Sequence, residues 1–193
     1  MGLTEFIRQI KDARKFAQKA HAGQFRRGKK GEKKLEFFTH PEAVAKIVWH
    51  VKSSNQIANL ITAAYLHDTV EDNDDVNIED IEEKFGKLVS SLVSELTSDK
   101  ELIQKLSKEK YLTEKMLNMT SWGLVIKLAD RLHNVQDIPE KLMSNDPEEQ
   151  KWAKKYAKQT ANIIKTLEEK RLLSSTQEEL IELIKERIKG YYN

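Results

Sequence analysis

Cysteine is absent from this sequence of 193 residues, which excludes disulfide bonds, thiolate zinc sites and thiol catalysis. Proline and glycine are scarce, with 3 and 7 residues, so positions that favour turns are few. No run alternates between apolar and polar residues for long enough to predict a β-strand. We therefore expect an all-α fold, and the length fits one domain over residues 1–193 with a substantial core.

Long apolar runs are absent as well. None approaches the roughly 20 apolar residues that a transmembrane helix needs, and the charged, amphipathic N-terminus does not resemble a secretory signal. Charge of one sign does not dominate, because 33 Lys and Arg residues oppose 31 Asp and Glu residues. With a net charge of +2, the chain as a whole gives no signal for nucleic-acid binding. We expect a cytoplasmic protein with neither a membrane nor a nucleic acid as its partner.

Apolar residues recur at helical spacing along most of the chain. The expected helices cover residues 4–22, 41–51, 55–71, 78–85, 88–96, 100–119, 121–137, 146–166 and 177–191. His21 lies at the end of the first helix, where the helix dipole favours an imidazolium, and a role as a metal ligand is the less favoured alternative. Residues 24–39 form a loop rich in Arg and Lys. This loop is either simply solvated or a phosphate-binding flap, in which Arg26 or Arg27 could also stack on a base.

The stretch Ala63–Asp72, AAYLHDTVED, places ionisable side chains in an otherwise apolar segment that predicts a largely buried helix. Helical residues four apart share a face, so His67 lies under Glu71 and Asp68 under Asp72. Burying these carboxylates without partners would cost several kcal/mol, and a bound cation would remove most of that cost. The alternative is a capped helix end whose acidic side chains face solvent.

A second buried helix, residues 121–137, is apolar on nearly all sides but contains Asp130. Asp130 and Asn134 lie four residues apart on one face. An aspartate inside such a helix needs a partner, and a metal ion, Arg131 or Lys127 could each serve. The segment by itself does not decide between these partners.

Two histidines and two aspartates could share one cation: His40, His67, Asp68 and Asp130. Two imidazoles and two carboxylates suit Mn, Fe, Zn or Mg better than copper(I) or an iron–sulfur cluster. Such a site leaves positions for water, and its ion would lower the pKa of that water and polarise a phosphoryl oxygen. Glu71 or Asp72 would then orient or deprotonate the water, or protonate the leaving group.

The same residues carry a family resemblance. His40, the His67–Asp68 doublet and Asp130 resemble the H…HD…D signature of HD-domain phosphohydrolases. The chain is more closely similar to the alarmone, (p)ppGpp, hydrolases, which include the hydrolase half of Rel/SpoT proteins and small stand-alone enzymes. The similar blocks follow the order of that family: HAGQFRR, FFTHPEAVA, AAYLHDTVEDND, IEEKFG and VIKLADRLHNV. They run from about residue 21 to residue 134.

This resemblance implies an all-α HD-domain helical bundle that removes the 3′-pyrophosphate of ppGpp or pppGpp and releases GDP or GTP. It implies one Mn²⁺ ion, with other divalent metals left open, on a set of four ligands: His40, His67, Asp68 and Asp130. Glu71 and Asp72 match the acidic pair that serves the attacking water. The nucleotide contacts that it implies are Arg26, Arg27 and Asn134. The length leaves no room for a synthetase domain, so only hydrolysis is expected.

Three other interpretations stay open. The same site could belong to a phosphatase of another nucleotide, for example one that removes the 2′-phosphate of NADPH. The chain could sense a nucleotide without turnover, although Glu71 and Asp72 argue against that. A protein that binds nucleic acid through its basic loop would lose affinity steeply with salt. A small-molecule nucleotide is the expected partner, and a homo-oligomer remains an option.

Overall fold

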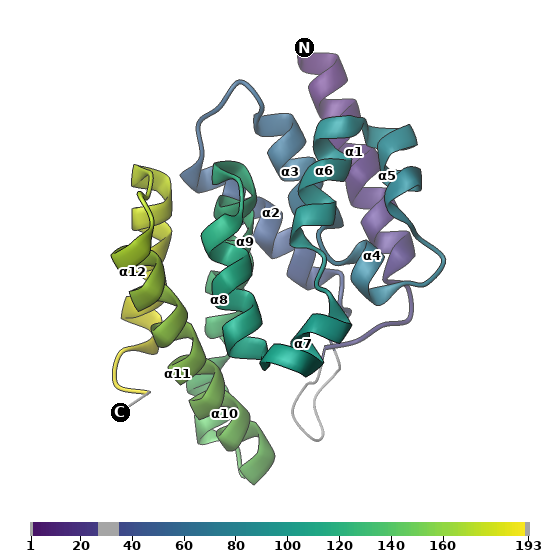
Figure 1. The fold of residues 1–193 in the computed structure, drawn as a ribbon. Coiled ribbons are helices and arrows are strands. Elements are labelled where there is room, and N and C mark those ends of the chain that lie inside the picture. The colour runs from purple at the N-terminus through teal and green to yellow at the C-terminus, as the bar shows by residue number, and fades with distance from the viewer. Residues whose placement is uncertain (1, 27–34, 192–193) are drawn as a thin grey trace. The chain divides into compact units, whose positions relative to one another are not determined.

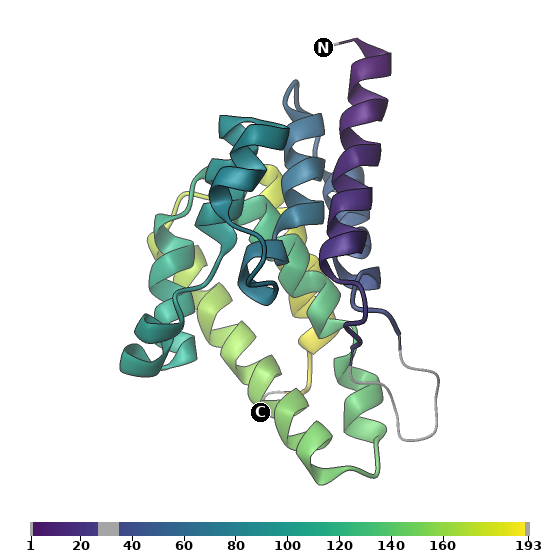
Figure 2. The same ribbon diagram turned by 90° about the vertical axis from the view of Figure 1, so that its right-hand side faces the viewer.

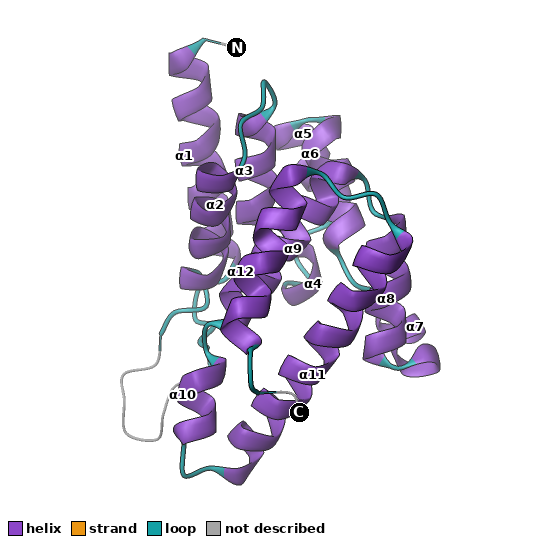
Figure 3. Ribbon diagram, turned by 90° about the vertical axis from the view of Figure 1, so that its left-hand side faces the viewer, coloured by secondary structure: helices purple, strands orange, loops and turns teal. Residues whose placement is uncertain are grey.

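Helices account for the regular secondary structure that the computed structural model describes, in residues 2–26 and 35–191 (Figure 3). Within these residues the extended pairing is limited to an isolated antiparallel bridge between Phe25 and Glu36. The prediction of an all-α fold is confirmed for this part of the chain. Contacts divide the chain into two compact units, Met1–Ser98 and Asp99–Asn193, and the single domain stays a prediction.

The helices are labelled in Figure 1. Those of the first unit are α1 Leu3–Ala20, α2 Thr39–Val51, α3 Ile57–Leu66, α4 Thr69–Asp72, α5 Ile78–Phe85 and α6 Lys87–Leu96. Those of the second unit are α7 Lys100–Leu106, α8 Lys108–Asn118, α9 Ser121–Val135, α10 Ile138–Met143, α11 Pro147–Lys170 and α12 Ser175–Ile188. Over the described ranges, no helix has both the length and the apolar character that crossing a membrane requires.

Helix α3 is the interior helix of the first unit. It packs against α1, α2 and α6, and every residue from Leu60 to Leu66 is buried. Helix α1 runs beside α3 (Figure 2) and buries three alanines at helical spacing: Ala13, Ala17 and Ala20. A helix that is apolar on all sides is stable only inside a protein, so the packing of these neighbours explains why α3 forms here.

The sequence predicted one continuous helix over residues 55–71, and the structure corrects this. Helix α3 ends at Leu66, and the short α4 begins at Thr69. Two side chains bond to carbonyls in the last turn of α3: the Thr69 hydroxyl donates to Leu66 O at 2.8 Å, and His67 Nδ1 lies 2.8 Å from Ala64 O. Such local side-chain bonds compete with the helical ladder, which gives a physical reason for the break at residues 67 and 68.

A second predicted helix, over residues 100–119, is also divided. Ser107 separates α7 from α8 and has a left-handed backbone with φ of +72°. Its hydroxyl accepts a hydrogen bond from Lys110 N at 3.5 Å, so it caps the start of α8. Serine is a preferred N-cap residue, and the apolar periodicity that predicted one helix does not reveal such a cap.

Helix α9 is the buried helix of the second unit and packs against α11 and α12. Its predicted burial is confirmed, although it ends at Val135 rather than at Asp137. Asp137 instead stands at the N-cap position of α10, whose first turn contains Pro139. Proline at the start of a helix cannot extend the preceding one, because it lacks the N–H that the ladder needs.

Arg171, directly after α11, holds the end of α8. Its guanidinium donates to the carbonyls of Met116, Leu117 and Met119 at 3.0, 2.7 and 2.6 Å. These carbonyls belong to the last turn of α8 and the residue beyond it, where the helical ladder provides no donors. One side chain thus satisfies three acceptors that would otherwise depend on water.

We expect Arg171→Met to lower the free energy of unfolding by about 2 kcal/mol, because charge-assisted hydrogen bonds to several acceptors are lost. Urea unfolding followed by circular dichroism measures this difference. Arg187→Met, at an exposed position of α12, is the matched control and should change stability little. Equal stability of the two variants would contradict the proposed capping role.

Candidate metal centre

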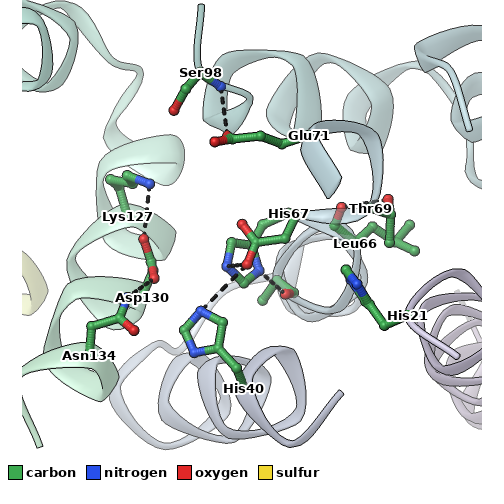
Figure 4. A network of polar contacts seen from close by, with 12 residues as sticks. His21, His40, Leu66, His67, Thr69, Glu71, Ser98, Lys127, Asp130 and Asn134 are labelled. Atoms are coloured by element: carbon green, nitrogen blue, oxygen red, sulfur yellow. Dashed lines mark hydrogen bonds and ion pairs between the residues drawn. The ribbon is translucent and has the colours of Figure 1, made fainter. Parts of the chain in front are cut away.

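The break between α3 and α4 gathers three potential metal ligands in the first unit. Asp68 Oδ2 lies 3.1 Å from His67 Nε2 and 3.5 Å from His40 Nε2. One ligand atom from each residue lies within 4.8 Å of the other two. The two imidazole rings stand edge to face, with centroids 5.2 Å apart, as Figure 4 shows from close by.

Two local features place the three residues. His40 lies in the first turn of α2, next to the buried Pro41. His67 and Asp68 occupy the break itself. The histidines are 4% and 1% exposed, whereas the Asp68 side chain keeps 20% of its surface accessible. The cluster is therefore mostly buried but open on the carboxylate side.

The hydrogen bond of His67 determines which of its ring nitrogens faces the cluster as a candidate ligand. A carbonyl oxygen only accepts, so the contact of Nδ1 with Ala64 O at 2.8 Å places a proton on Nδ1. The Nε2 atom then faces the Asp68 carboxylate, and either a proton or a metal ion between them makes that approach favourable. A neutral imidazole fixed through Nδ1 by a backbone carbonyl is the usual form of a metal-binding histidine. Two imidazole nitrogens and a carboxylate oxygen therefore fit a divalent cation.

The acidic pair follows on α4. Asp72 N donates to Asp68 O at 2.9 Å, so Asp72 lies one helical turn beyond the candidate ligand. The carboxylate of Glu71 is fixed separately, since its Oε2 accepts a hydrogen bond from Ser98 N at 2.9 Å (Figure 4). Asp72 is exposed and Glu71 is half-buried. One carboxylate of the pair is therefore held by the backbone at the end of the first unit.

Asp130, the fourth predicted ligand, belongs to the second unit. It is 7% exposed, and its Oδ2 lies 2.9 Å from Lys127 Nζ. Its Oδ1 accepts a hydrogen bond from Asn134 Nδ2 at 2.6 Å, as Figure 4 also shows. Of the two side-chain partners considered from the sequence, Lys127 forms the ion pair. Arg131 instead donates to Thr160 Oγ1 at 2.7 Å and lies over the Tyr156 ring.

The structure describes one of the two arginines predicted to contact a nucleotide. Arg26 is half-buried beside the bridge between Phe25 and Glu36, and its N–H donates to Leu35 O at 2.9 Å. The base of the loop is thus a paired segment, where the sequence predicted only a loop. Arg27 lies outside the described residues, as does the basic stretch that follows it.

His21 is a residue whose surroundings the sequence did not indicate. It is 2% exposed, its Nδ1 lies 2.7 Å from Gln24 Oε1, and its ring centroid is 4.8 Å from that of Phe37. Burial lowers the pKa of His21 below its ordinary value, although the bond to Gln24 and the nearby Asp68 charge oppose this. The neutral imidazole is therefore favoured over the imidazolium expected at a helix end.

Comparison with known proteins identifies the family of this chain. A family model described as HD domain matches residues 13–172. Over 130 residues the chain is 35% identical to human guanosine-3′,5′-bis(diphosphate) 3′-pyrophosphohydrolase MESH1, an alignment that covers 67% of this chain and 69% of the human protein. The chain therefore belongs to the HD domain family, as the sequence motifs predicted.

Two further relatives extend this comparison. The solved structure of a metazoan ortholog of SpoT, which hydrolyzes ppGpp and plays a role in starvation responses, matches with a TM-score of 0.71. That match has 25% sequence identity and covers 93% of this chain and 95% of the other. GTP pyrophosphokinase of Streptomyces coelicolor is 36% identical over 138 residues, which is 70% of this chain but 15% of that protein.

We expect Asp68→Ala to weaken Mn²⁺ binding by at least about a hundredfold, because the charged oxygen between the two imidazoles is lost. Titration calorimetry measures the affinity, and a metal-induced rise in the thermal midpoint gives an independent reading. Asp74→Ala, an exposed aspartate just after α4, removes the same charge without touching the cluster. Equal Mn²⁺ affinity in the two variants would exclude Asp68 as a ligand.

Proposed function

We propose that this chain hydrolyses the 3′-pyrophosphate of ppGpp and pppGpp, releasing pyrophosphate with GDP or GTP. The observation that carries the proposal is the His40, His67 and Asp68 cluster, in an HD domain related to a protein with that named activity. The small-molecule substrate is the guanosine nucleotide, and we propose the cytoplasm as the place of action.

The proposed cofactor is one Mn²⁺ ion. Its ligands would be the three clustered residues together with Asp130, which matches the final aspartate of the HD signature. Lys127 and Asn134 orient the Asp130 carboxylate inside its own unit. Nitrogen and carboxylate donors of this kind accept Mn²⁺, and other divalent ions also fit them. When bound, such an ion supplies Lewis-acid polarisation of a phosphoryl oxygen and lowers the pKa of a water molecule.

The acidic pair would transfer the protons of the reaction. In the proposed reaction a water oxygen bonds to the phosphorus attached to O3′ of the ribose, and the bond between that phosphorus and O3′ breaks. The water gives up a proton and O3′ gains one, so the reaction needs both an acceptor and a donor. Glu71 and Asp72 are the carboxylates assigned to this work, and the Ser98 N–H keeps the Glu71 carboxylate in a fixed place.

Basic and amide side chains would bind the nucleotide. Arg26 has a planar guanidinium that can stack on a guanine base, and its backbone is held by the pairing with Leu35. Arg27 would supply charge to the phosphates. Asn134, whose amide nitrogen donates to Asp130 Oδ1, would add an amide contact to the nucleotide.

The direct test compares two substrates. Metal-stripped protein is incubated with ppGpp and with NADPH, each with and without Mn²⁺, and the products are separated by anion-exchange chromatography. We expect GDP and pyrophosphate from ppGpp, and only when Mn²⁺ is present. Inorganic phosphate from NADPH without turnover of ppGpp would identify NADPH, and not ppGpp, as the substrate. No turnover of either by metal-loaded protein would refute the proposed activity.

Glu71→Gln separates chemistry from binding. The amide oxygen can still accept from Ser98 N–H, so the side chain should stay in place while its proton-transfer capacity is lost. We expect kcat to fall by about 10²–10⁴-fold with little change in Mn²⁺ affinity. Steady-state kinetics at saturating metal measure this, with the exposed Glu79→Gln of α5 as the matched control. An unchanged kcat would show that Glu71 transfers no proton in the rate-limiting step.

A further inference from the structure

A chain of side-chain hydrogen bonds joins the end of α1 to the acidic helix α4. His21 Nδ1 lies 2.7 Å from Gln24 Oε1, and Gln24 Nε2 donates to the backbone oxygen of Asp72 at 2.9 Å. A second bond runs beside it, from Asn73 Nδ2 to Ala20 O at 2.9 Å. The last residue of α4 and the residue after it are thus both anchored to the end of α1.

These contacts fix the direction of every hydrogen bond in the chain. The Asp72 carbonyl can only accept, so the Gln24 amide must turn its NH₂ group toward it. The Gln24 oxygen then faces His21 and can only accept, which places a proton on His21 Nδ1. Since burial favours the neutral imidazole, the His21 Nε2 atom carries a lone pair.

Gln24 also joins this chain to the base of the basic loop. Its backbone oxygen accepts from Phe37 N at 2.9 Å, and its N–H donates to His21 O at 3.1 Å. The next two residues are Phe25, in the bridge to Glu36, and Arg26. One residue therefore connects the end of α1, the base of the loop and the backbone of Asp72.

The burial of His21 argues against a purely structural role. Its Nε2 is buried and has no hydrogen-bond partner among the residues that the structure describes. An unsatisfied buried acceptor lowers stability, so packing alone would be served better by an apolar side chain of similar size. The imidazole is better explained by what its Nδ1–H holds in place.

We propose that His21 and Gln24 are positioning residues for Asp72, holding α4 in the register that its two carboxylates need for hydrolysis. This inference rests on the proposed function, because that function assigns proton transfer to Glu71 and Asp72. Neither residue has to touch substrate or metal. Misplacing a reacting group by about 1 Å can reduce a rate by about a hundredfold, so a lost bond in this chain is measurable.

Gln24→Glu tests the chain with almost no change of shape. The carboxylate can still accept from His21 Nδ1–H, but its other oxygen faces the Asp72 carbonyl with no proton to donate. We expect kcat for ppGpp to fall about tenfold to a hundredfold, with KM and Mn²⁺ affinity changing less than about threefold. Gln18→Glu, on the exposed surface of α1, adds the same charge and should leave kcat unchanged. Loss of Mn²⁺ affinity or stability without a fall in kcat at saturation would overturn the proposal.

His21→Asn and His21→Leu test whether the Nδ1–H donor of His21 is the part of the side chain that matters. The amide nitrogen of Asn takes the place of Nδ1 and can still donate to Gln24, whereas Leu only fills the space. We expect His21→Asn to retain kcat within about threefold and His21→Leu to lose as much as Gln24→Glu. His50→Asn, at an exposed histidine of α2, is the control for the substitution itself. Equal loss in both His21 variants would overturn the proposal, since the Nδ1 donor would then not be the part that matters.

A measurement without substrate separates this inference from the proposed function. Nitrogen-15 chemical shifts of the wild-type protein report which nitrogen of His21 carries the proton, and hydrogen exchange reports the protection of the Asp72 amide. We expect the Nδ1–H form, and faster exchange at Asp72 in Gln24→Glu than in Gln18→Glu. The Nε2–H form or unchanged exchange would refute the hydrogen-bond chain. Absent ppGpp turnover by the wild type would refute the proposed function instead.

Discussion

The hydrogen bond between His67 Nδ1 and the Ala64 carbonyl is the interaction on which the candidate site depends. It occupies an acceptor in the last turn of α3, and the Thr69 hydroxyl occupies a second one there, Leu66 O. The helix ends there, and two neighbouring side chains that a regular helix would separate by about 100° come to face each other. The same bond fixes the tautomer of His67. One contact thus shapes both the backbone and the ligand chemistry.

The surroundings of that break are held from several sides within the first unit. His40 lies in the first turn of α2, and the backbone N–H of Ser98 fixes the carboxylate of Glu71. Gln24 donates to the carbonyl of Asp72, the last residue of α4. A helix of four residues has almost no stability of its own, because it cannot offset the entropy of nucleation. Its position therefore depends on these bonds to its neighbours.

The fold class and the identity of the clustered residues could be predicted from the sequence, because periodicity and the HD motif are local signals. The break at His67 could not, since apolar residues continue at helical spacing from Ala64 through Val70. The spacing of apolar residues does not show that a side chain will compete with the helix for a backbone carbonyl. The left-handed Ser107 was missed for a similar reason. For Asp130 the sequence left open a metal ion, Arg131 or Lys127, and the side-chain geometry within α9 was needed to identify Lys127 as the ion-pair partner.

The interior position of α3 limits how the sequence around the site can change in length. One residue inserted between Leu60 and Leu66 would turn everything after it by about 100° and shift it by about 1.5 Å. Because all of these positions are buried, no surface could absorb that rotation. The turn after α4, with exposed Asp74 and Asp75, carries no such restriction. Insertions and deletions should therefore be excluded from α3 as strictly as substitutions at the candidate ligands, while the acidic turn can vary in length.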